Sequence, residues 1–127
     1  MNTQTATGRK LLFIEDEPFI SELYSRALKK AGYEVSIIND GLQGFGEAKT
    51  NAYDIILLDL MIPNILGMDI LRRLRAEMPT LKSKIIVTTN LEQSKEKRAE
   101  LEKQADGYLI KAEVTPRELV DFLSRIR

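Results

Sequence analysis

The chain has 127 residues, the length of one compact domain, of which 43% are hydrophobic and 30% charged. It contains no cysteine, histidine or tryptophan, which excludes disulfides, thiolate chemistry, histidine bases and zinc sites built on Cys or His. The 19 basic and 19 acidic residues cancel, whereas a nucleic-acid-binding domain normally carries a basic excess. Carboxylates, hydroxyls and lysines are the chemistry that remains, and no nucleic-acid partner is expected.

The N-terminal residues contain neither an export signal nor a membrane span. Residues 1–8 are polar and uncharged, and Arg9 and Lys10 precede only four apolar residues, at 11–14. A signal peptide needs about 7 to 15 apolar residues and a membrane helix about 20. We therefore expect a cytoplasmic protein without membrane contact, in which residues 1–9 form a flexible tail and residues 10–127 form the domain.

Short apolar runs alternate with helical patterns along the chain. The apolar runs predict strands at 11–14, 33–38, 55–58, 85–87 and 108–110. The helical patterns predict helices at 18–31, 42–49, 68–76, 91–104 and 116–126. Thr115, followed by Pro116 and then Glu118, is a capping box with proline at the first helical position.

Two of the predicted helices differ in the apolar face that they offer. The first has apolar residues spaced by three and four, which predicts one buried stripe: Ile20, Leu23, Ala27, Leu28 and Ala31. The fourth offers few apolar residues, namely Leu91, Ala99, Leu101 and Ala105. We expect the fourth helix to be loosely attached, with its many charges forming a solvated face.

Five consecutive strand–helix units predict an α/β fold with a doubly wound parallel sheet and helices on both faces. In such open sheets, ligands bind beyond the carboxyl ends of the strands. The residues that follow the strands are Glu15, Asp16 and Glu17, then Asp59, then Thr88, Thr89 and Asn90, and finally Lys111. Gathered carboxylates favour a hard cation such as Mg²⁺, and an aspartate carboxylate is a known nucleophile for phosphate. These groups therefore point to a phosphoryl-accepting site.

Four short motifs appear in a fixed order, each at the end of a predicted strand. They are an acidic pair within residues 14–18, an apolar run ending in Asp59 within 57–63, the hydroxyl Thr89, and a lysine motif within 107–111. Asp59 and Thr89 are 30 positions apart, Thr89 and Tyr108 are 19 apart, and Tyr108 and Lys111 are three apart. Over residues 10–127 the chain resembles the receiver domain of two-component response regulators, of the single-domain chemotaxis-regulator kind. The resemblance implies a (βα)5 flavodoxin-like receiver fold with strand order 2-1-3-4-5.

The resemblance also implies a role for each of these residues. Asp59 would be the phosphorylated aspartate, Thr89 the hydroxyl that closes on the phosphoryl group, and Lys111 the lysine that pairs with it. Tyr108 would be the aromatic that moves with the switch. Mg²⁺ would be held by a set of oxygen ligands from Glu15, Asp16, Asp59 and the backbone carbonyl of Met61.

The resemblance implies a stand-alone response regulator that promotes its own phosphorylation and its own dephosphorylation, as a phosphoacceptor more than a conventional enzyme. The donor would be a phosphohistidine on a sensor histidine kinase or a histidine phosphotransfer protein. Phosphorylation would shift the surface formed by the fourth helix, fifth strand and fifth helix towards a downstream protein target. The chain would be a monomer or a weak dimer that depends on phosphorylation.

The chain departs from the family pattern at four positions. Glu15 stands where aspartate is commoner, Leu66 replaces an acidic or polar residue, and Asn90 replaces alanine or glycine. Ala112 replaces the proline after the lysine, so a cis peptide is not expected there. We expect these departures to affect reaction rates and loop shape more than function.

Several other interpretations remain open on the sequence alone. Residues 15–17 also suit the start of a helix, Thr88 is an alternative to Thr89, and Tyr108 also suits a half-buried strand position without switching. The whole chain could be a pseudo-receiver that only binds proteins, a receiver fragment of a longer regulator, or a flavodoxin-like cofactor binder. The acidic residues after the first strand argue against the last, because they would repel a phosphate that lacks a metal.

Overall fold

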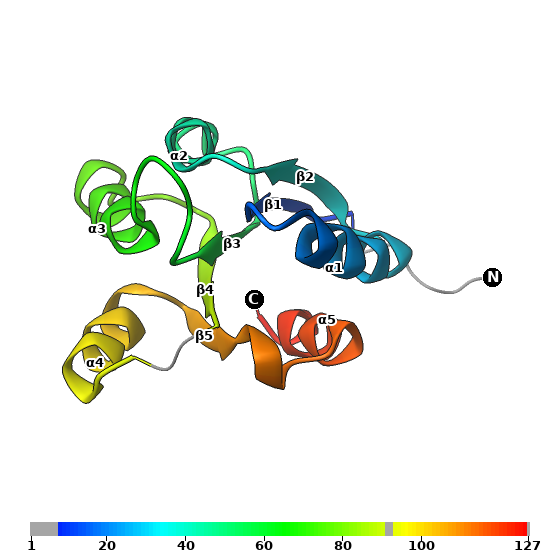
Figure 1. Cartoon of the computed structure of the whole chain (residues 1–127). Helices are drawn as coiled ribbons and strands as arrows, with labels where there is room; N and C mark the ends of the chain where they lie inside the picture. The colour runs from blue at the N-terminus through cyan, green and yellow to red at the C-terminus, as the bar shows by residue number, and fades with distance from the viewer. Residues whose placement is uncertain (1–7, 91–92, 127) are drawn as a thin grey trace.

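The computed structural model describes residues 8–90 and 93–126, which form five strands, five α-helices and one 3₁₀ turn (Figure 1). The strands are β1 (Lys10–Ile14), β2 (Glu34–Ile38), β3 (Ile55–Asp59), β4 (Lys84–Thr89) and β5 (Gly107–Ile110). The helices are α1 (Pro18–Lys30), α2 (Gly41–Ala48), α3 (Gly67–Glu77), α4 (Lys95–Gln104) and α5 (Pro116–Ser124). The 3₁₀ turn η1 (Lys111–Glu113) connects β5 to α5.

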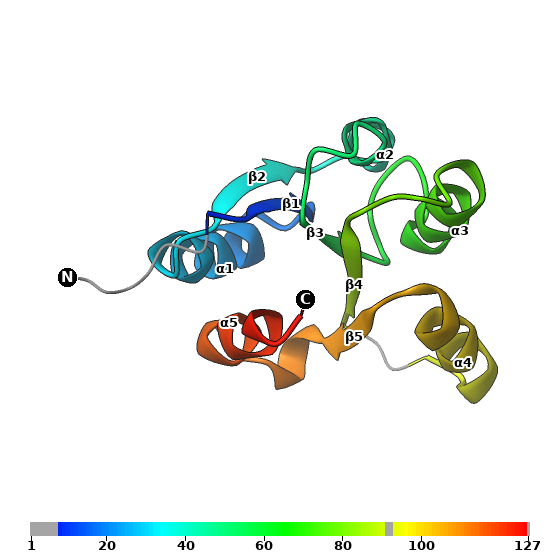
Figure 2. The ribbon, with the colours of Figure 1, turned by 180° about the vertical axis from the view of Figure 1, so that it is seen from behind.

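The strands form a single parallel sheet in the order β2-β1-β3-β4-β5, which confirms the predicted fold and strand order. The strand order reverses between β1 and β3, the two central strands that bound the expected ligand crevice. Seen from behind, β2 and β5 lie at the two edges of the sheet (Figure 2).

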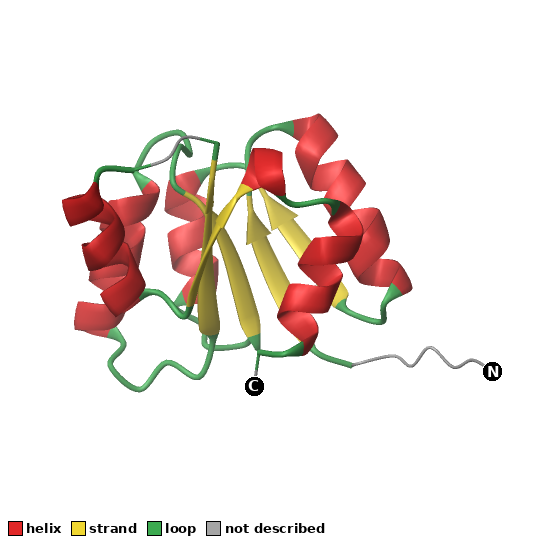
Figure 3. Cartoon of the chain, turned by 90° about the horizontal axis from the view of Figure 1, so that it is seen from below, coloured by secondary structure: helices red, strands yellow, loops and turns green. Residues whose placement is uncertain are grey.

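Helices cover both faces of the sheet, and each face has its own apolar core (Figure 3). Strand residues alternate between the cores because successive side chains point to opposite faces. Leu12 and Ile14 pack with helices α2, α3 and α4, whereas Leu11 and Phe13 pack with helices α1 and α5. The central strands are therefore buried on both sides, as their unbroken apolar sequences predicted.

The buried face of α1 differs from the predicted stripe. Leu28 is fully buried, but Leu23 is 39% exposed, and Tyr24 takes the place in the core that the spacing gave to Leu23. Tyr24 belongs to the core that α5 also enters through Leu119 and Leu123. The face of α1 that packs against α5 therefore carries the aromatic side chain of Tyr24, and not the predicted aliphatic side chain of Leu23.

Helix α4 is shorter than the sequence predicted. Leu91 lies outside the described residues, and the helix begins at Lys95 with Ser94 as its N-cap, whose hydroxyl accepts from the Lys97 amide at 3.2 Å. Ala99 is exposed, but Leu101 is buried as expected. The expectation of few apolar contacts therefore holds for the described part of this helix.

Residues 1–7 of the expected tail lie outside the described residues, and its last two residues contact the domain. The Gly8 amide donates to the Gly32 carbonyl at 3.3 Å, and the Arg9 guanidinium donates to the Ile126 carbonyl at 2.9 Å. Within the described part of the chain, no helix has the length and apolar character needed to cross a membrane.

Candidate phosphoryl-accepting site

The carboxyl ends of β1, β3 and β5 bring three charged side chains into contact. The Lys111 ammonium lies 2.8 Å from Glu15 Oε1 and 3.2 Å from Asp59 Oδ2. The side chains of Lys111 and Asp59 are each only 4% exposed, and that of Glu15 is fully covered. These contacts join residues 52 and 96 positions apart in the chain, so only the parallel sheet unites them.

Glu15 has a partner for each of its carboxylate oxygens. Oε1 accepts from Lys111, and Oε2 accepts from the Glu17 amide at 3.1 Å. Burial raises the pKa of Glu15, and the nearby charge of Asp59 raises it further, whereas the Lys111 hydrogen bond opposes both. For Lys111, burial alone would lower the pKa, but the hydrogen bond that its ammonium donates to Glu15 and the negative charge of Asp59 outweigh burial and raise the pKa. Lys111 is therefore held as a cation.

Asp59 is the last residue of β3, and both of its carboxylate oxygens are bonded. Oδ2 accepts from Lys111, and Oδ1 accepts from the Met61 amide at 3.0 Å. The chain then turns back so that Gly67, the first residue of α3, lies against the strand end. A Cβ at Gly67 would sit 2.4 Å from the Asp59 carbonyl oxygen and 2.6 Å from Leu60 Cα. Only glycine fits here, so the role of Gly67 is close packing beneath Asp59.

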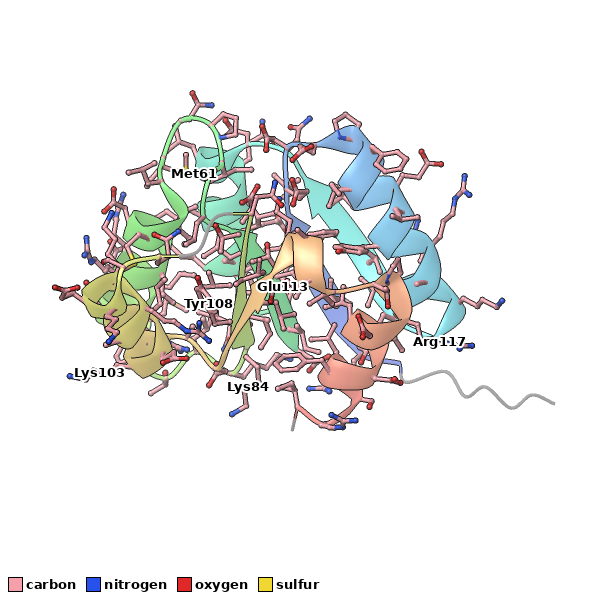
Figure 4. The ribbon with its side chains drawn as sticks, turned by 60° about the horizontal axis from the view of Figure 1, so that its bottom comes forward. Met61, Lys84, Lys103, Tyr108, Glu113 and Arg117 are labelled. Carbon is pink, nitrogen blue, oxygen red and sulfur yellow. The ribbon has the colours of Figure 1, made fainter. Side chains whose placement is uncertain are left out.

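Glu15, Asp16 and Asp59 form a group whose carboxylate oxygens all lie within 4.8 Å of one another. Glu15 and Asp59 are buried, whereas Asp16 is open to solvent. Three carboxylates facing one ammonium leave an excess of negative charge, and oxygen donors of this kind suit Mg²⁺. Met61 lies in the loop at this end of the sheet, opposite the end where Lys84 begins β4 (Figure 4).

The two threonines at the end of β4 are both buried. Thr88 pairs with Asp59 in the β3–β4 ladder, and its hydroxyl has no hydrogen-bond partner among the described residues. Thr89 is fully buried and pairs with Ile110 in the β4–β5 ladder. Asn90 follows and is exposed. The structure places both threonines at the strand end, so the choice between them stays a prediction.

Tyr108 lies on β5 beneath helix α4 (Figure 4). Its hydroxyl is buried without a hydrogen-bond partner in the described part of the chain, and the Arg98 guanidinium lies 4.8 Å from the centre of its ring. This cation–π contact links α4 directly to β5. This contact could not be predicted from the sequence, because Arg98 is one of many charged residues on α4.

Polar contacts with α3 also hold helix α4 in place. Arg72 makes two hydrogen bonds to the Glu100 carboxylate, at 2.8 and 3.0 Å. Arg75 donates to the Gln104 carbonyl at 2.7 Å and to the Asp106 carboxylate at 3.0 Å. The charged face of α4 is therefore partly a contact between helices, where the sequence favoured a solvated surface.

The segment after Lys111 forms its turn without a proline. Lys111–Glu113 is one turn of 3₁₀ helix, closed by a 3.3 Å hydrogen bond from the Val114 amide to the Lys111 carbonyl. The Tyr24 hydroxyl reaches this turn from α1, at 2.7 Å from the Val114 carbonyl and 3.3 Å from the Lys111 carbonyl. The role of Tyr24 could not be predicted from periodicity, because its partners are 87 and 90 positions away.

Known proteins share both the sequence pattern and the fold. Residues 11–124 match the family described as response regulator receiver domain. Response regulator ArlR of Staphylococcus saprophyticus is 38% identical over 93% of this chain and 50% of its own length. Transcriptional regulatory protein CusR of Escherichia coli K12 is 36% identical over 93% of this chain and 49% of its own length. The chain thus spans about half the length of these curated relatives.

Solved structures give the same result for the fold. Chemotaxis response regulator CheY4 of Vibrio cholerae superposes with a TM-score of 0.83 and 30% identity, over 95% of this chain and 100% of that one. The beryllofluoride-activated N-terminal receiver domain of RstA from Klebsiella pneumoniae gives a TM-score of 0.78 and 28% identity, over 91% of this chain and 95% of that one. The chain belongs to the response regulator receiver domain family.

Proposed function

We propose that the chain is a response regulator receiver domain that accepts a phosphoryl group on the carboxylate of Asp59. The observation that carries this proposal is the buried contact of Lys111 with Asp59 and Glu15, at 3.2 and 2.8 Å. A buried carboxylate is costly unless it is paired, and here the partner is an ammonium that would also pair with a phosphoryl oxygen. The same lysine thus supports the empty and the phosphorylated forms of the site.

We assign the magnesium site to Glu15, Asp16, Asp59 and the carbonyl of Met61. Asp16 is open to solvent and Asp59 carries the carboxylate that would receive the phosphoryl group, so we assign direct contacts to these two residues. For Glu15, whose side chain is fully covered and accepts from Lys111 and the Glu17 amide, we assign a contact through water. A bound Mg²⁺ would neutralise the carboxylates and stabilise negative charge on the transferring phosphoryl group. Asp16 is open to solvent, which suits a ligand that has to admit the ion.

The donor in this proposal is a phosphohistidine on a sensor histidine kinase or a histidine phosphotransfer protein, since the chain itself has no histidine. A carboxylate oxygen of Asp59 attacks phosphorus, the P–N bond to the donor imidazole breaks, and the imidazole takes a proton from solvent. Lys111 pairs with a phosphoryl oxygen as the group arrives. Water later hydrolyses the acyl phosphate and restores the carboxylate, so the chain is a phosphoacceptor more than a conventional enzyme.

The signal would leave through the surface formed by α4, β5 and α5. Thr89 would move towards the phosphoryl group, Tyr108 would follow, and α4 would shift. Few buried apolar side chains of α4 resist such a shift, Leu101 being the one fully buried within the helix. The phosphoryl group would act by changing the populations of two existing states.

The proposed setting is the cytoplasm, with a sensor histidine kinase upstream and a protein target downstream. The chain would act as a monomer or as a weak dimer formed on phosphorylation. Because it spans about half the length of ArlR and CusR, a domain of the same polypeptide is the alternative target. Comparing the binding of a downstream protein by this chain with its binding by a longer product of the same gene would distinguish a separate protein target from a domain of the same polypeptide.

The test is a titration with Mg²⁺ and then beryllofluoride, followed by amide NMR of the folded protein. We expect Mg²⁺ to shift amides around Asp16 and Asp59, and beryllofluoride to extend the shifts to Thr89, Tyr108 and α4. Asp59→Asn should keep the fold and lose the beryllofluoride response. Absence of Mg²⁺-dependent shifts near Asp59, or the same response in Asp59→Asn, would refute the proposal.

The second candidate is a pseudo-receiver that binds proteins without phosphotransfer. It is favoured by the shorter distance from Lys111 to Glu15 than to Asp59, and by the exposed Asn90 beside the site. Incubation with acetyl phosphate and Mg²⁺, followed by intact-mass measurement, separates the two candidates. The receiver gains one phosphoryl group that Asp59→Asn does not gain, whereas the pseudo-receiver gains none.

A further inference from the structure

Tyr24 of helix α1 is buried beside the segment that carries Lys111. Its ring stacks on Phe13, with centroids 6.4 Å apart and planes inclined by 22°. Its hydroxyl lies 2.7 Å from the Val114 carbonyl and 3.3 Å from the Lys111 carbonyl. A phenol has one proton to donate, so the Val114 carbonyl is the main acceptor and the Lys111 carbonyl a weaker one.

These two carbonyls lie at the ends of the 3₁₀ turn that follows β5. The turn itself is closed by one long hydrogen bond, from the Val114 amide to the Lys111 carbonyl at 3.3 Å. Ala112, in the middle of the turn, has no ring that would fix the backbone. The Tyr24 hydroxyl is therefore a contact from a separate element that holds both ends of the turn together.

Lys111 is at once the first residue of this turn and the source of the buried ammonium. Its Nζ reaches Glu15 and Asp59, so a displacement of its backbone displaces the charge at the site. Helix α1, by contrast, is fixed by its packing on the sheet, with Tyr24 only 5% exposed and Leu28 fully buried. Through the Tyr24 hydroxyl, the well-packed helix α1 thus supports the backbone from which the flexible side chain of Lys111 extends.

We infer that Tyr24 is a positioning residue, whose hydroxyl holds the backbone of Lys111 so that the ammonium meets the phosphoryl group on Asp59. The inference rests on the proposed function and names a group that acts through another residue, without touching the phosphoryl group itself. The Tyr24 hydroxyl bonds the backbone of Lys111 and Val114 and none of the proposed metal ligands. Its loss should therefore weaken recognition of the phosphoryl group without weakening Mg²⁺ binding.

The experiment uses Tyr24→Phe, which removes the hydroxyl and keeps the ring on Phe13. Tyr53→Phe is the matched control, because its hydroxyl bonds the Glu47 carboxylate at 2.7 Å and its ring lies in the core on the opposite face of the sheet. Mg²⁺ affinity and beryllofluoride affinity in saturating Mg²⁺ are measured by amide NMR. For Tyr24→Phe we expect a roughly tenfold weaker beryllofluoride affinity, the size of one lost hydrogen bond, with no weakening of Mg²⁺ affinity.

A double-mutant comparison distinguishes a specific effect of Tyr24 on the position of Lys111 from a general loosening of the fold. If Tyr24 acts through Lys111, adding Tyr24→Phe to Lys111→Met should cost no further beryllofluoride affinity. An additive loss would overturn the inference, as would an equal loss of Mg²⁺ and beryllofluoride affinity in Tyr24→Phe, or an unchanged beryllofluoride affinity.

The ¹³Cε and ¹⁵Nζ NMR signals of Lys111 give a second readout that needs no phosphoryl mimic. We expect them to move in Tyr24→Phe and to stay in place in Tyr53→Phe, and unchanged signals in Tyr24→Phe would overturn the inference. If the wild-type protein fails to bind beryllofluoride, the proposed function fails. The lysine signals alone then decide whether Tyr24 positions Lys111.

Discussion

Lys111 Nζ lies nearer to Glu15, at 2.8 Å, than to Asp59, at 3.2 Å. The ammonium is therefore shared between a carboxylate that keeps it in place and the carboxylate that we propose to be phosphorylated. Glu15 stands where aspartate is commoner, and while one of its oxygens accepts from Lys111, the second accepts from the Glu17 amide. Glu15 thus holds the lysine from one side, as Tyr24 holds its backbone from the other.

Replacing Lys111 should show how much its positive charge contributes to the stability of the protein. Lys111→Met leaves two buried carboxylates without their cation, and we expect the free energy of unfolding to fall by about 3 kcal/mol without metal. Mg²⁺ should restore part of this loss, because a divalent cation then supplies the missing positive charge. Urea unfolding with EDTA and with excess Mg²⁺ measures both effects.

The control for this prediction is Lys103→Met on the exposed face of α4. Its stability should change by less than about 0.5 kcal/mol, with no difference in its response to Mg²⁺. If Lys111→Met were as stable as the wild-type protein without metal, the buried carboxylates would have to be protonated, and the proposed charge balance would be wrong.

Gly67 offers a steric test of the strand end that carries Asp59. The added methyl group of Gly67→Ala would clash with the Asp59 carbonyl oxygen and Leu60 Cα, so we expect a loss of about 1–3 kcal/mol in the free energy of unfolding. Gly46→Ala is the matched change, because a Cβ there meets no atom within 4 Å. It should raise stability by up to about 1 kcal/mol through helix propensity alone. Equal effects of the two changes in urea unfolding would contradict this account.

Thr88 and Thr89 can be distinguished by removing one hydroxyl at a time. Thr88→Val removes a buried hydroxyl that lacks a partner among the described residues, so we expect stability to rise by about 1 kcal/mol and the beryllofluoride response to remain. Thr89→Ala should keep beryllofluoride binding at Asp59 and lose the shifts at Tyr108 and α4. Amide NMR with beryllofluoride decides between them, and the reverse pattern would make Thr88 the switch hydroxyl.

Alkaline pH should weaken the fold through its buried tyrosines. Burial raises the pKa of Tyr24, Tyr33 and Tyr53 above the ordinary value. The free energy of unfolding that they contribute is complete below the unfolded pKa, about 10, and is lost as pH rises towards the folded value. In urea unfolding between about pH 9 and 11, the wild-type protein should lose more stability than Tyr24→Phe. Absorbance at 295 nm should show one late-titrating tyrosine fewer in the variant, and identical titrations would contradict the shift.

The sheet and its carboxyl edge could be predicted because their signals are local. The unbroken apolar runs at 11–14 and 55–58 identify strands covered on both faces, and Asp59 and Lys111 follow such runs directly. The capping box of Thr115 and Glu118, whose two hydrogen bonds are 3.1 and 2.9 Å, likewise needs only residues three apart.

Contacts that join distant segments could not be predicted in this way. Spacing assigned Leu23 to the core of α1, but α5 and the turn after β5 make Tyr24 the buried residue. Helix propensity predicts that α4 begins at Leu91, because propensity alone does not show that the side chain of Ser94 caps the helix and that the helix begins at Lys95. The ion pairs of Arg72 and Arg75 were missed for the same reason, since their partners lie 28 to 31 positions away.

Apart from the buried Leu101, helix α4 is attached mainly through partly exposed charges such as the Arg72–Glu100 ion pair with α3, whereas α1 is attached by buried packing. Exposed ion pairs weaken as salt increases, because the screening length falls from about 10 Å at 0.1 M to about 3 Å at 1 M. Apolar packing has no such dependence on dissolved ions. Rising ionic strength should therefore loosen α4 before it affects the rest of the fold. The salt concentration around the protein becomes a second influence on the proposed output surface, separate from phosphorylation.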